Sequence, residues 1–295
     1  MRGWLWIGIA AAAVVPGLVS RFTDVSLNSG SAAVIYGLAI VSGAFLLSWA
    51  SEVAELDIPR SLSISLLAIV AVLPEYAIDV YLAWTAADVP ENVHLATANM
   101  TGANRLLIGI GWSLVVFLFW LQTRQKTLAI SQSNSAAIVI LALATAYSFT
   151  IIIKGYLHIA DTVVLGALFG LYMWMSFKGK VEAPMLVGPS ALIGALPPLR
   201  RRTIAGLMFV YSAVAIVVSA EPFVEGLKDT GEALDLSEFL LIQWVAPLAS
   251  EAPEILLAGI FVLRGRPSDG LGILVSSKVN QWTLLVGAIP IAFAL

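Results

Sequence analysis

The chain contains no cysteine and few charged residues. Of its 295 residues only 12% are Asp, Glu, Lys or Arg, and the formal net charge is -3. The absence of cysteine excludes disulfides, thiolate metal sites and cysteine nucleophiles. The few basic residues form no run outside the connections between apolar stretches, so nothing in the composition indicates binding to nucleic acid.

Apolar residues dominate instead. They make up 59% of the chain, and the mean hydropathy is +0.92, which is too apolar for a soluble domain with a polar surface. A helix that crosses a bilayer needs about 17 to 25 apolar residues. Nine stretches of about that length lie at 4–20, 31–51, 62–86, 95–121, 134–153, 157–177, 203–227, 238–264 and 269–294. The sequence therefore predicts an all-α polytopic membrane protein that retains 4–20 as its first span.

The charges lie mainly in the connections between these stretches. Basic residues gather in 122–133, 178–202 and 264–268, whereas 221–238 is mostly acidic. The positive-inside rule predicts that the three basic connections are cytoplasmic and that the acidic one lies on the opposite side. We expect an integral protein of the cell membrane (plasma or inner membrane) that is a monomer.

An internal repeat is present in the chain. The segments Leu46–Glu75 and Val224–Glu254 each carry Leu-Asp after a polar stretch, then an apolar run, then Pro-Glu, and downstream Asn104 corresponds to Asn280. An odd number of spans separates the copies, so they are predicted to cross the membrane in opposite senses.

The sequence thus predicts two inverted-topology repeats of about five transmembrane helices each. The first half is 1–153, with its repeat motif at 44–121, and the second half is 154–295, with its repeat motif at 220–294.

The second copy places two acids, Glu251 and Glu254, beside Pro247 and Pro253 in a stretch apolar enough to span a bilayer. A carboxylate in lipid costs a few kcal/mol unless it pairs with a cation or faces a polar cavity, so such acids usually mark an ion or proton path. A proline within a helix also frees a backbone carbonyl that an ion or water can satisfy. The alternative is a proline kink whose acids are satisfied by other side chains.

With both copies of these motifs the chain resembles the calcium/cation antiporter superfamily of sodium/calcium and cation/proton exchangers. That family has two inverted repeats, each with Gly-Thr-Ser-x-Pro-Glu on one helix and Gly-Asn-x-x-Gly-Ser-Asn opening the next. Here the first copy reads VAVLPE at 70–75 and ANMTGAN at 98–104, and the second reads ASEAPE at 249–254 and LVSSKVN at 274–280.

The resemblance implies that Glu75 and Glu254 are the central cation-ligating carboxylates, and that Asn99 and Ser250 are further oxygen ligands. Glu251 stands where the family has a hydroxyl, and we count it with them as a candidate ligand.

The chain departs from the family at several positions. Ala71 and Val72 replace hydroxyls of the first copy, Val275 stands where a second asparagine is expected, and Lys278 replaces a glycine. The family usually has ten spans, whereas this chain ends at Leu295 soon after the ninth, so we expect that the last helix is missing or that the sequence is a fragment.

Lys278, Asp79 and Thr101 are candidates for coupling. If Lys278 faces the same cavity, it would pair with Glu251 or Glu254 when the site is empty and oppose a divalent cation when the site is filled. Alternatively, its ammonium extends to the membrane interface. Asp79 follows the first Pro-Glu pair by one helical turn, and it either extends the ion path or lies at the interface.

These features favour a secondary antiporter that exchanges Na+ and/or Ca2+ for H+ or another cation by alternating access. Calcium prefers six to eight oxygen ligands, so the lost hydroxyls and Lys278 favour sodium/proton exchange slightly over a calcium/cation exchanger proper. We expect no cofactor besides the transported ions, and the lipid bilayer and small inorganic cations as partners.

Two alternatives come from other classes of protein. An intramembrane enzyme could use paired carboxylates, but no HExxH motif or serine/histidine pairing accompanies the acids, so we predict that the chain is not an enzyme. A non-transporting membrane scaffold would not need two inverted copies of an acid-bearing helix break.

Overall fold

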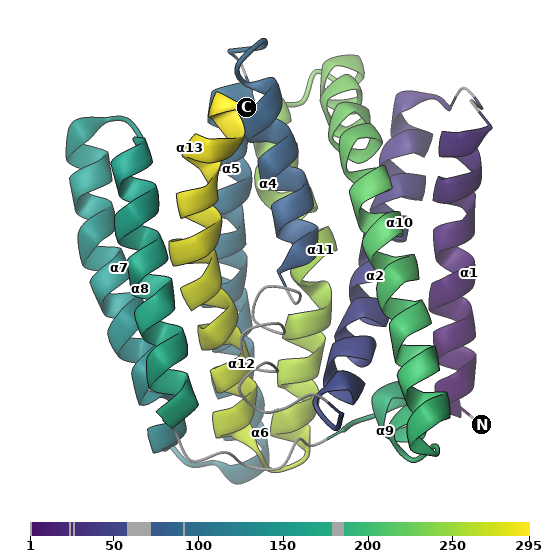
Figure 1. Ribbon diagram of the computed structural model, residues 1–295, viewed down its shortest axis with the longest axis vertical. Coiled ribbons are helices and arrows are strands. Elements are labelled where there is room, and N and C mark those ends of the chain that lie inside the picture. Colours follow the sequence, from purple (N-terminus) through teal and green to yellow (C-terminus); the bar gives the residue numbers. More distant parts are fainter. Residues whose placement is uncertain (1, 24, 26, 58–71, 91, 179–185) are drawn as a thin grey trace. The chain divides into compact units, whose positions relative to one another are not determined.

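The computed structural model describes the whole chain except residues 1, 24, 26, 58–71, 91 and 179–185 (Figure 1). Every regular element in the described residues is helical, and η1 and η3 are π-helices. The elements are α1 (Arg2–Phe22), α2 (Ser29–Ala54), α4 (Leu73–Thr85), α5 (Asn92–Asn104), η1 (Arg105–Trp112), α6 (Ser113–Thr123), η2 (Gln132–Asn134), α7 (Ser135–Lys154), α8 (Ile159–Lys178), α9 (Pro189–Gly194), α10 (Pro198–Ala233), α11 (Glu238–Leu263), α12 (Pro267–Asn280), η3 (Gln281–Leu285) and α13 (Val286–Ala294).

Seven helices in the described part of the chain are long and apolar enough to cross a membrane. They coincide with seven of the predicted spans, so the predicted all-α membrane fold is confirmed. The predicted span 62–86 begins within 58–71, outside the described residues, and ends as α4. The predicted span 269–294 forms α12, η3 and α13 in succession.

Helix ends follow local chemistry. The Oδ1 of Asn28 accepts a hydrogen bond from the Ser31 N–H at 2.9 Å, which caps the start of α2. Helix α7 ends at Lys154 and is followed by Gly155, whose φ of 75° places it in the left-handed region that glycine adopts without strain.

The helices form two compact units, each built from two segments of the chain. The first unit is Met1–Ile78 with Val181–Ser250, and the second is Asp79–Lys180 with Glu251–Leu295. Each unit therefore contains residues of both predicted halves. The compact units reflect packing, whereas the halves were inferred from sequence repetition, and the division into halves stays a prediction.

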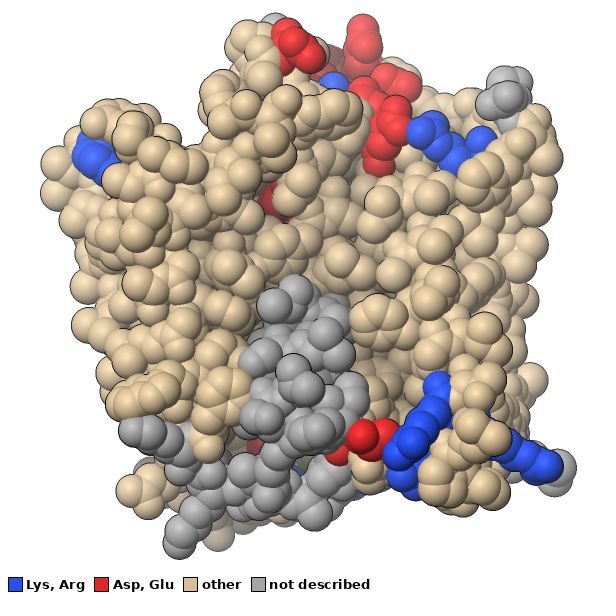
Figure 2. All heavy atoms as spheres, in the orientation of Figure 1, with Lys and Arg blue, Asp and Glu red and all other residues tan. Residues whose placement is uncertain are grey.

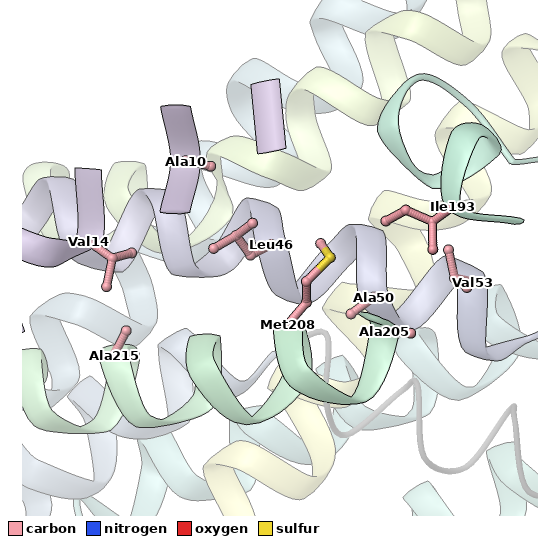
Figure 3. Close-up of a cluster of buried hydrophobic side chains, with 9 residues drawn as sticks. All are labelled: Ala10, Val14, Leu46, Ala50, Val53, Ile193, Ala205, Met208 and Ala215. Atoms are coloured by element: carbon pink, nitrogen blue, oxygen red, sulfur yellow. The ribbon is translucent and has the colours of Figure 1, made fainter. Parts of the chain in front are cut away.

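In the first unit, α10 packs antiparallel to α2. As the residue number rises along α2 it falls along α10, as shown by the opposed pairs Ala33 and Gly226, Gly37 and Phe223, and Gly43 and Ile216. Small residues allow this close approach, which suits helix packing in a membrane. Helices α1 and α9 add to a buried apolar cluster around α2 and α10 (Figure 3), formed by Ala10, Val14, Leu46, Ala50, Val53, Ile193, Ala205, Met208 and Ala215.

In the second unit, the segment from α5 to η2 runs antiparallel to the segment from α12 to η3. The opposed pairs are Asn104 and Trp282, Gly111 and Leu274, and Ser131 and Ser268. Helices α7 and α8 pack on each other, and they contact α12 and α13 respectively.

Corresponding parts of the two repeats thus run antiparallel within each unit. Helices α2 and α10 lead into the two copies of the acidic motif, and α5 and α12 carry the two asparagine motifs. This antiparallel pairing confirms the inverted repeat predicted from the odd number of intervening spans.

The Ser131 N–H donates to the Ser268 hydroxyl at 2.7 Å, and Gln122 Nε2 donates to the Leu263 carbonyl at 3.1 Å. The basic connections 122–133 and 264–268 therefore lie at the same end of the second unit, in agreement with the charge rule.

The two ends of α10 in the first unit differ in charge. The N-terminal end of α10 carries Arg201 and Arg202, whereas its C-terminal end carries Asp229 and Glu232. On the helices of this unit in Figure 2, charged side chains of both signs lie at the two ends, with blue prominent at the lower end and red at the upper end, and the surface between them carries few charges. This pattern is typical of a membrane-spanning bundle.

Asp57 ties the end of α2 to the start of α10. Arg201 Nε and Nη2 donate to its carboxylate at 2.8 and 2.7 Å, and Arg202 Nε donates at 2.9 Å. The hydrogen bonds from Arg201 lower the pKa of Asp57 to about 2 against the opposing effect of burial.

We expect Arg201→Gln to lower the melting temperature of the detergent-solubilised protein more than the control Arg202→Gln does. Arg201 supplies two of the three hydrogen bonds, and its side chain is 19% exposed against 60% for Arg202. Because folding lowers the pKa of Asp57, the stabilisation is complete above the unfolded pKa and is lost as the pH falls toward about 2. Thermal unfolding at several pH values checks this, and equal losses in the two variants would contradict it.

Candidate cation-exchange site

Helix α11 carries three predicted ligands in buried positions. Ser250 and Glu251 are 1% and 0% exposed, and Glu254 is 9% exposed. The Ser250 hydroxyl donates to the Ala246 carbonyl at 3.3 Å and to the Pro247 carbonyl at 3.2 Å. Its oxygen lone pairs can still accept or ligate.

Pro253 and Pro247 lie within α11 and have no N–H to donate along the helix. The carbonyls one turn before them therefore lack their usual helical donor, as the sequence pattern indicated.

Helix α4 carries Glu75 and Asp79 one turn apart, and both are buried, at 0% and 1% exposure. Asn99 on α5 is also completely buried, and its Nδ2 donates to Asp79 Oδ1 at 2.8 Å. Within the described residues, Asp79 Oδ2 and Asn99 Oδ1 are buried with no hydrogen-bond partner. Each of these oxygens can act as a cation ligand, because buried acceptors are otherwise almost always satisfied.

The sequence singled out Asp79 and Asn99 separately, as a coupling candidate and a ligand. The structure joins them by a hydrogen bond, an arrangement that their spacing of 20 residues does not indicate.

Lys278 is completely buried, which argues against the alternative that its ammonium extends to the membrane interface. Its ammonium donates to Gln281 Oε1, and Gln281 Nε2 in turn donates to Glu251 Oε1 at 2.7 Å. Lys278 also interacts electrostatically with Asp79. The predicted pairing of Lys278 with Glu251 is thus made through an intervening amide.

Gln281 is a residue that the sequence reasoning missed. Its only signal is its position directly after the repeat asparagine Asn280, and that position carries no information about a partner 30 residues earlier.

Thr101 is less deeply buried than the other candidates. Its hydroxyl donates to the Thr97 carbonyl at 2.7 Å and, at 3.3 Å, to the Ala98 carbonyl on its own helix.

A π-helix follows each of the two asparagine motifs. The π-helix η1 begins directly after Asn104, and η3 begins directly after Asn280, the corresponding residue of the other repeat. The Trp282 Nε1 of η3 donates to Asn104 Oδ1 at 2.9 Å, which joins the two repeats. Single π-turns within α-helices often occur at functional sites, and the sequence patterns did not predict these.

The predicted ligands are carried by both units. Glu75 and Ser250 belong to the first unit, whereas Asn99, Glu251 and Glu254 belong to the second. Across the residues that the structure describes, no group of three or more His, Asp or Glu side chains is arranged to hold a metal ion. The assignment of these side chains as ligands stays a prediction.

Residues 29–178 and 204–293 match the family described as sodium/calcium exchanger protein. The chain belongs to this family. The matched residues include every candidate ligand and coupling residue, from Glu75 to Lys278. The recognition made from the repeated Pro-Glu and asparagine motifs is therefore confirmed, and this exchanger-family chain is an integral membrane protein.

Several solved structures are similar to this exchanger-family chain. The crystal structure of the H+/Ca2+ exchanger CAX is 42% identical, with a TM-score of 0.95, and the match covers 100% of this chain and 75% of the other. The structure of native YfkE is 15% identical, with a TM-score of 0.71 over 96% of this chain and 80% of the other.

The sodium-calcium exchanger NCX_Mj is 19% identical, with a TM-score of 0.56 over 90% of this chain and 86% of the other. The identities to YfkE and NCX_Mj are low, so these two likenesses concern the fold alone. A search of curated proteins gives no match.

Proposed function

We propose that this chain exchanges Ca2+ for H+ across a membrane by alternating access. The observation that carries the proposal is the 42% identity, over the whole chain, to a protein described as an H+/Ca2+ exchanger. The preference for sodium/proton exchange drawn from the sequence receives no support from these comparisons. The proposal includes no enzymatic activity and no cofactor besides the transported ions.

The buried acids suit this exchange. Calcium binds hard oxygen donors, carboxylates above all. Glu75 and Glu254 are the proposed central ligands, with Asn99 and Ser250 adding neutral oxygens, and all four are buried. A buried carboxylate is strongly disfavoured as a bare anion, so it takes either a cation or a proton. Calcium and protons therefore compete for the same side chains, which is the requirement for exchange.

We expect purified protein in liposomes to take up calcium-45 when the lumen is more acidic than the bath, and to stop when an ionophore collapses the pH gradient. A sodium gradient alone, at equal pH on both sides, is expected to drive no uptake. The competing outcome is sodium-driven calcium uptake, or pH-driven sodium-22 uptake without calcium uptake. Either result would replace the proposal by sodium/calcium or sodium/proton exchange.

A further inference from the structure

Three polar side chains form a continuous hydrogen-bonded chain inside the second unit. Lys278 donates to Gln281, and Gln281 donates to Glu251 at 2.7 Å. Their exposed fractions are 0%, 3% and 0%. Such a chain, with an ammonium at one end and a carboxylate at the other, is fully removed from water.

The charges at the two ends of this hydrogen-bonded chain determine the orientation of the Gln281 amide. The Gln281 oxygen faces the ammonium, which can only donate, and its NH2 group faces the carboxylate, which can only accept when ionised. The reversed amide would oppose donor to donor and acceptor to acceptor. Gln281 therefore transmits the attraction between Lys278 and Glu251 across the gap between them, in a low-dielectric interior where that attraction is strong.

Lys278 also acts electrostatically on the carboxylate of Asp79. The Oδ1 of Asp79, however, accepts a hydrogen bond from the Asn99 amide at 2.8 Å, and its Oδ2 has no hydrogen-bond partner within the described part of the chain. Asp79 is thus held by a neutral group, whereas Glu251 is held by a hydrogen-bonded chain that ends in a cation.

We propose that Lys278 and Glu251, joined by Gln281, form a charge-compensated pair that sets the net charge of the cation site, and that Glu251 belongs to this pair and does not ligate the transported ion. The proposal rests on the proposed exchange function and revises the role expected for Glu251. Lys278 acts as a built-in monovalent cation, so the pair contributes no net charge. Glu254 then remains as the ligand acid of α11.

Single substitutions should shift calcium affinity in opposite directions. Lys278→Gln leaves the Glu251 carboxylate uncompensated, and calcium is expected to bind about tenfold more tightly. Glu251→Gln leaves the ammonium uncompensated, and calcium is expected to bind about tenfold more weakly. The readout is equilibrium binding of calcium-45 to the full-length protein in detergent, which requires no proton gradient.

The double variant Glu251→Gln/Lys278→Gln decides the proposal. It removes both charges of the pair, and we expect calcium affinity to return to within about threefold of the wild type. Two matched controls remove the same formal charges: Glu254→Gln/Lys278→Gln and Asp79→Asn/Lys278→Gln. In neither control is calcium affinity expected to return to the wild-type value. If the Glu251 double variant stays at the level of Glu251→Gln, Glu251 is a ligand and the proposal is overturned. If calcium affinity instead returns to the wild-type value in Asp79→Asn/Lys278→Gln, Asp79 is the partner of Lys278, and the proposal is likewise overturned.

The same set of variants distinguishes a loss of folding from a loss of function. A single variant with an uncompensated buried charge can lose stability, so thermal unfolding is measured in parallel, and the comparison rests on the three double variants of equal formal charge. Failure of proton-driven calcium uptake in the wild type would contradict the proposed function alone. The pattern of recovery, measured with sodium-22 if calcium does not bind, tests the pair independently.

Discussion

Glu254→Gln and Glu75→Gln should each lower calcium flux in proteoliposomes by more than about 100-fold, which corresponds to at least about 2.7 kcal/mol. Each change removes a negative charge from a buried position, 9% and 0% exposed, while side-chain volume and hydrogen-bonding capacity are kept. A neutral amide oxygen attracts a divalent cation far less than a carboxylate does in a medium of low dielectric constant. The loss should therefore arise from cation binding and not from misfolding.

Glu52→Gln is the matched control for these two variants. Glu52 lies near the end of α2 and accepts a hydrogen bond from the Ser190 hydroxyl, which the Gln oxygen can also accept. Flux in this variant should stay close to the wild type. Size-exclusion profiles and melting temperatures establish that all three variants are folded. If both site variants retain flux, the carboxylate pair does not carry the transported ion.

Gly226→Val should unfold the first unit or prevent its insertion. A Cβ at Gly226 would lie 2.7 Å from the backbone nitrogen of Ala33 on α2, and valine adds two methyl groups beyond it. Backbone atoms of a packed helix cannot move aside as a flexible side chain can, so α10 must separate from α2. Overpacking of side chains usually costs about 1 to 3 kcal/mol, and this backbone contact places the expected cost at or above the top of that range.

Gly206→Val is the control that tests whether the destabilisation by Gly226→Val arises from the contact with α2 or from the change of glycine to valine itself. Gly206 is on the same helix, and a Cβ there would meet no atom within 4 Å. Its stability should change by no more than about 0.5 kcal/mol. Yields of monodisperse protein and melting temperatures in detergent provide the measurement. Similar behaviour of the two valine variants would show that the contact between α2 and α10 does not govern folding.

The spans and the inverted repeat could be predicted from sequence because both are local properties. A stretch such as 134–153 is apolar over the length of a bilayer whatever surrounds it, and the structure has α7 at Ser135–Lys154. The pairing of Pro74-Glu75 with Pro253-Glu254 is visible along the chain, and the odd number of spans between them dictates opposite orientation. Burial of Glu75, Glu251 and Glu254 follows from the free-energy cost of exposing a carboxylate to lipid.

The sequence also placed Lys278 within the second asparagine motif and related it to the acids of α11. It did not indicate Gln281 as the intermediary, because a pattern along one helix contains no information on the distance to another helix. The same holds for the bond between Asn99 and Asp79 and for the contact between Asn104 and Trp282, which are 178 residues apart.

By itself, then, the sequence determined the membrane class, the repeat and the three motif acids Glu75, Glu251 and Glu254, because composition, periodicity and repetition are properties of each segment alone. Only the tertiary structure decided which charged side chains are linked by hydrogen bonds and where the α-helices continue as π-helices. It also decided that each compact unit contains residues of both predicted halves of the chain. The physical reason is that hydrogen bonds and ion pairs depend on separations of about 3 Å between atoms of different helices, and those separations exist only once the backbones have packed.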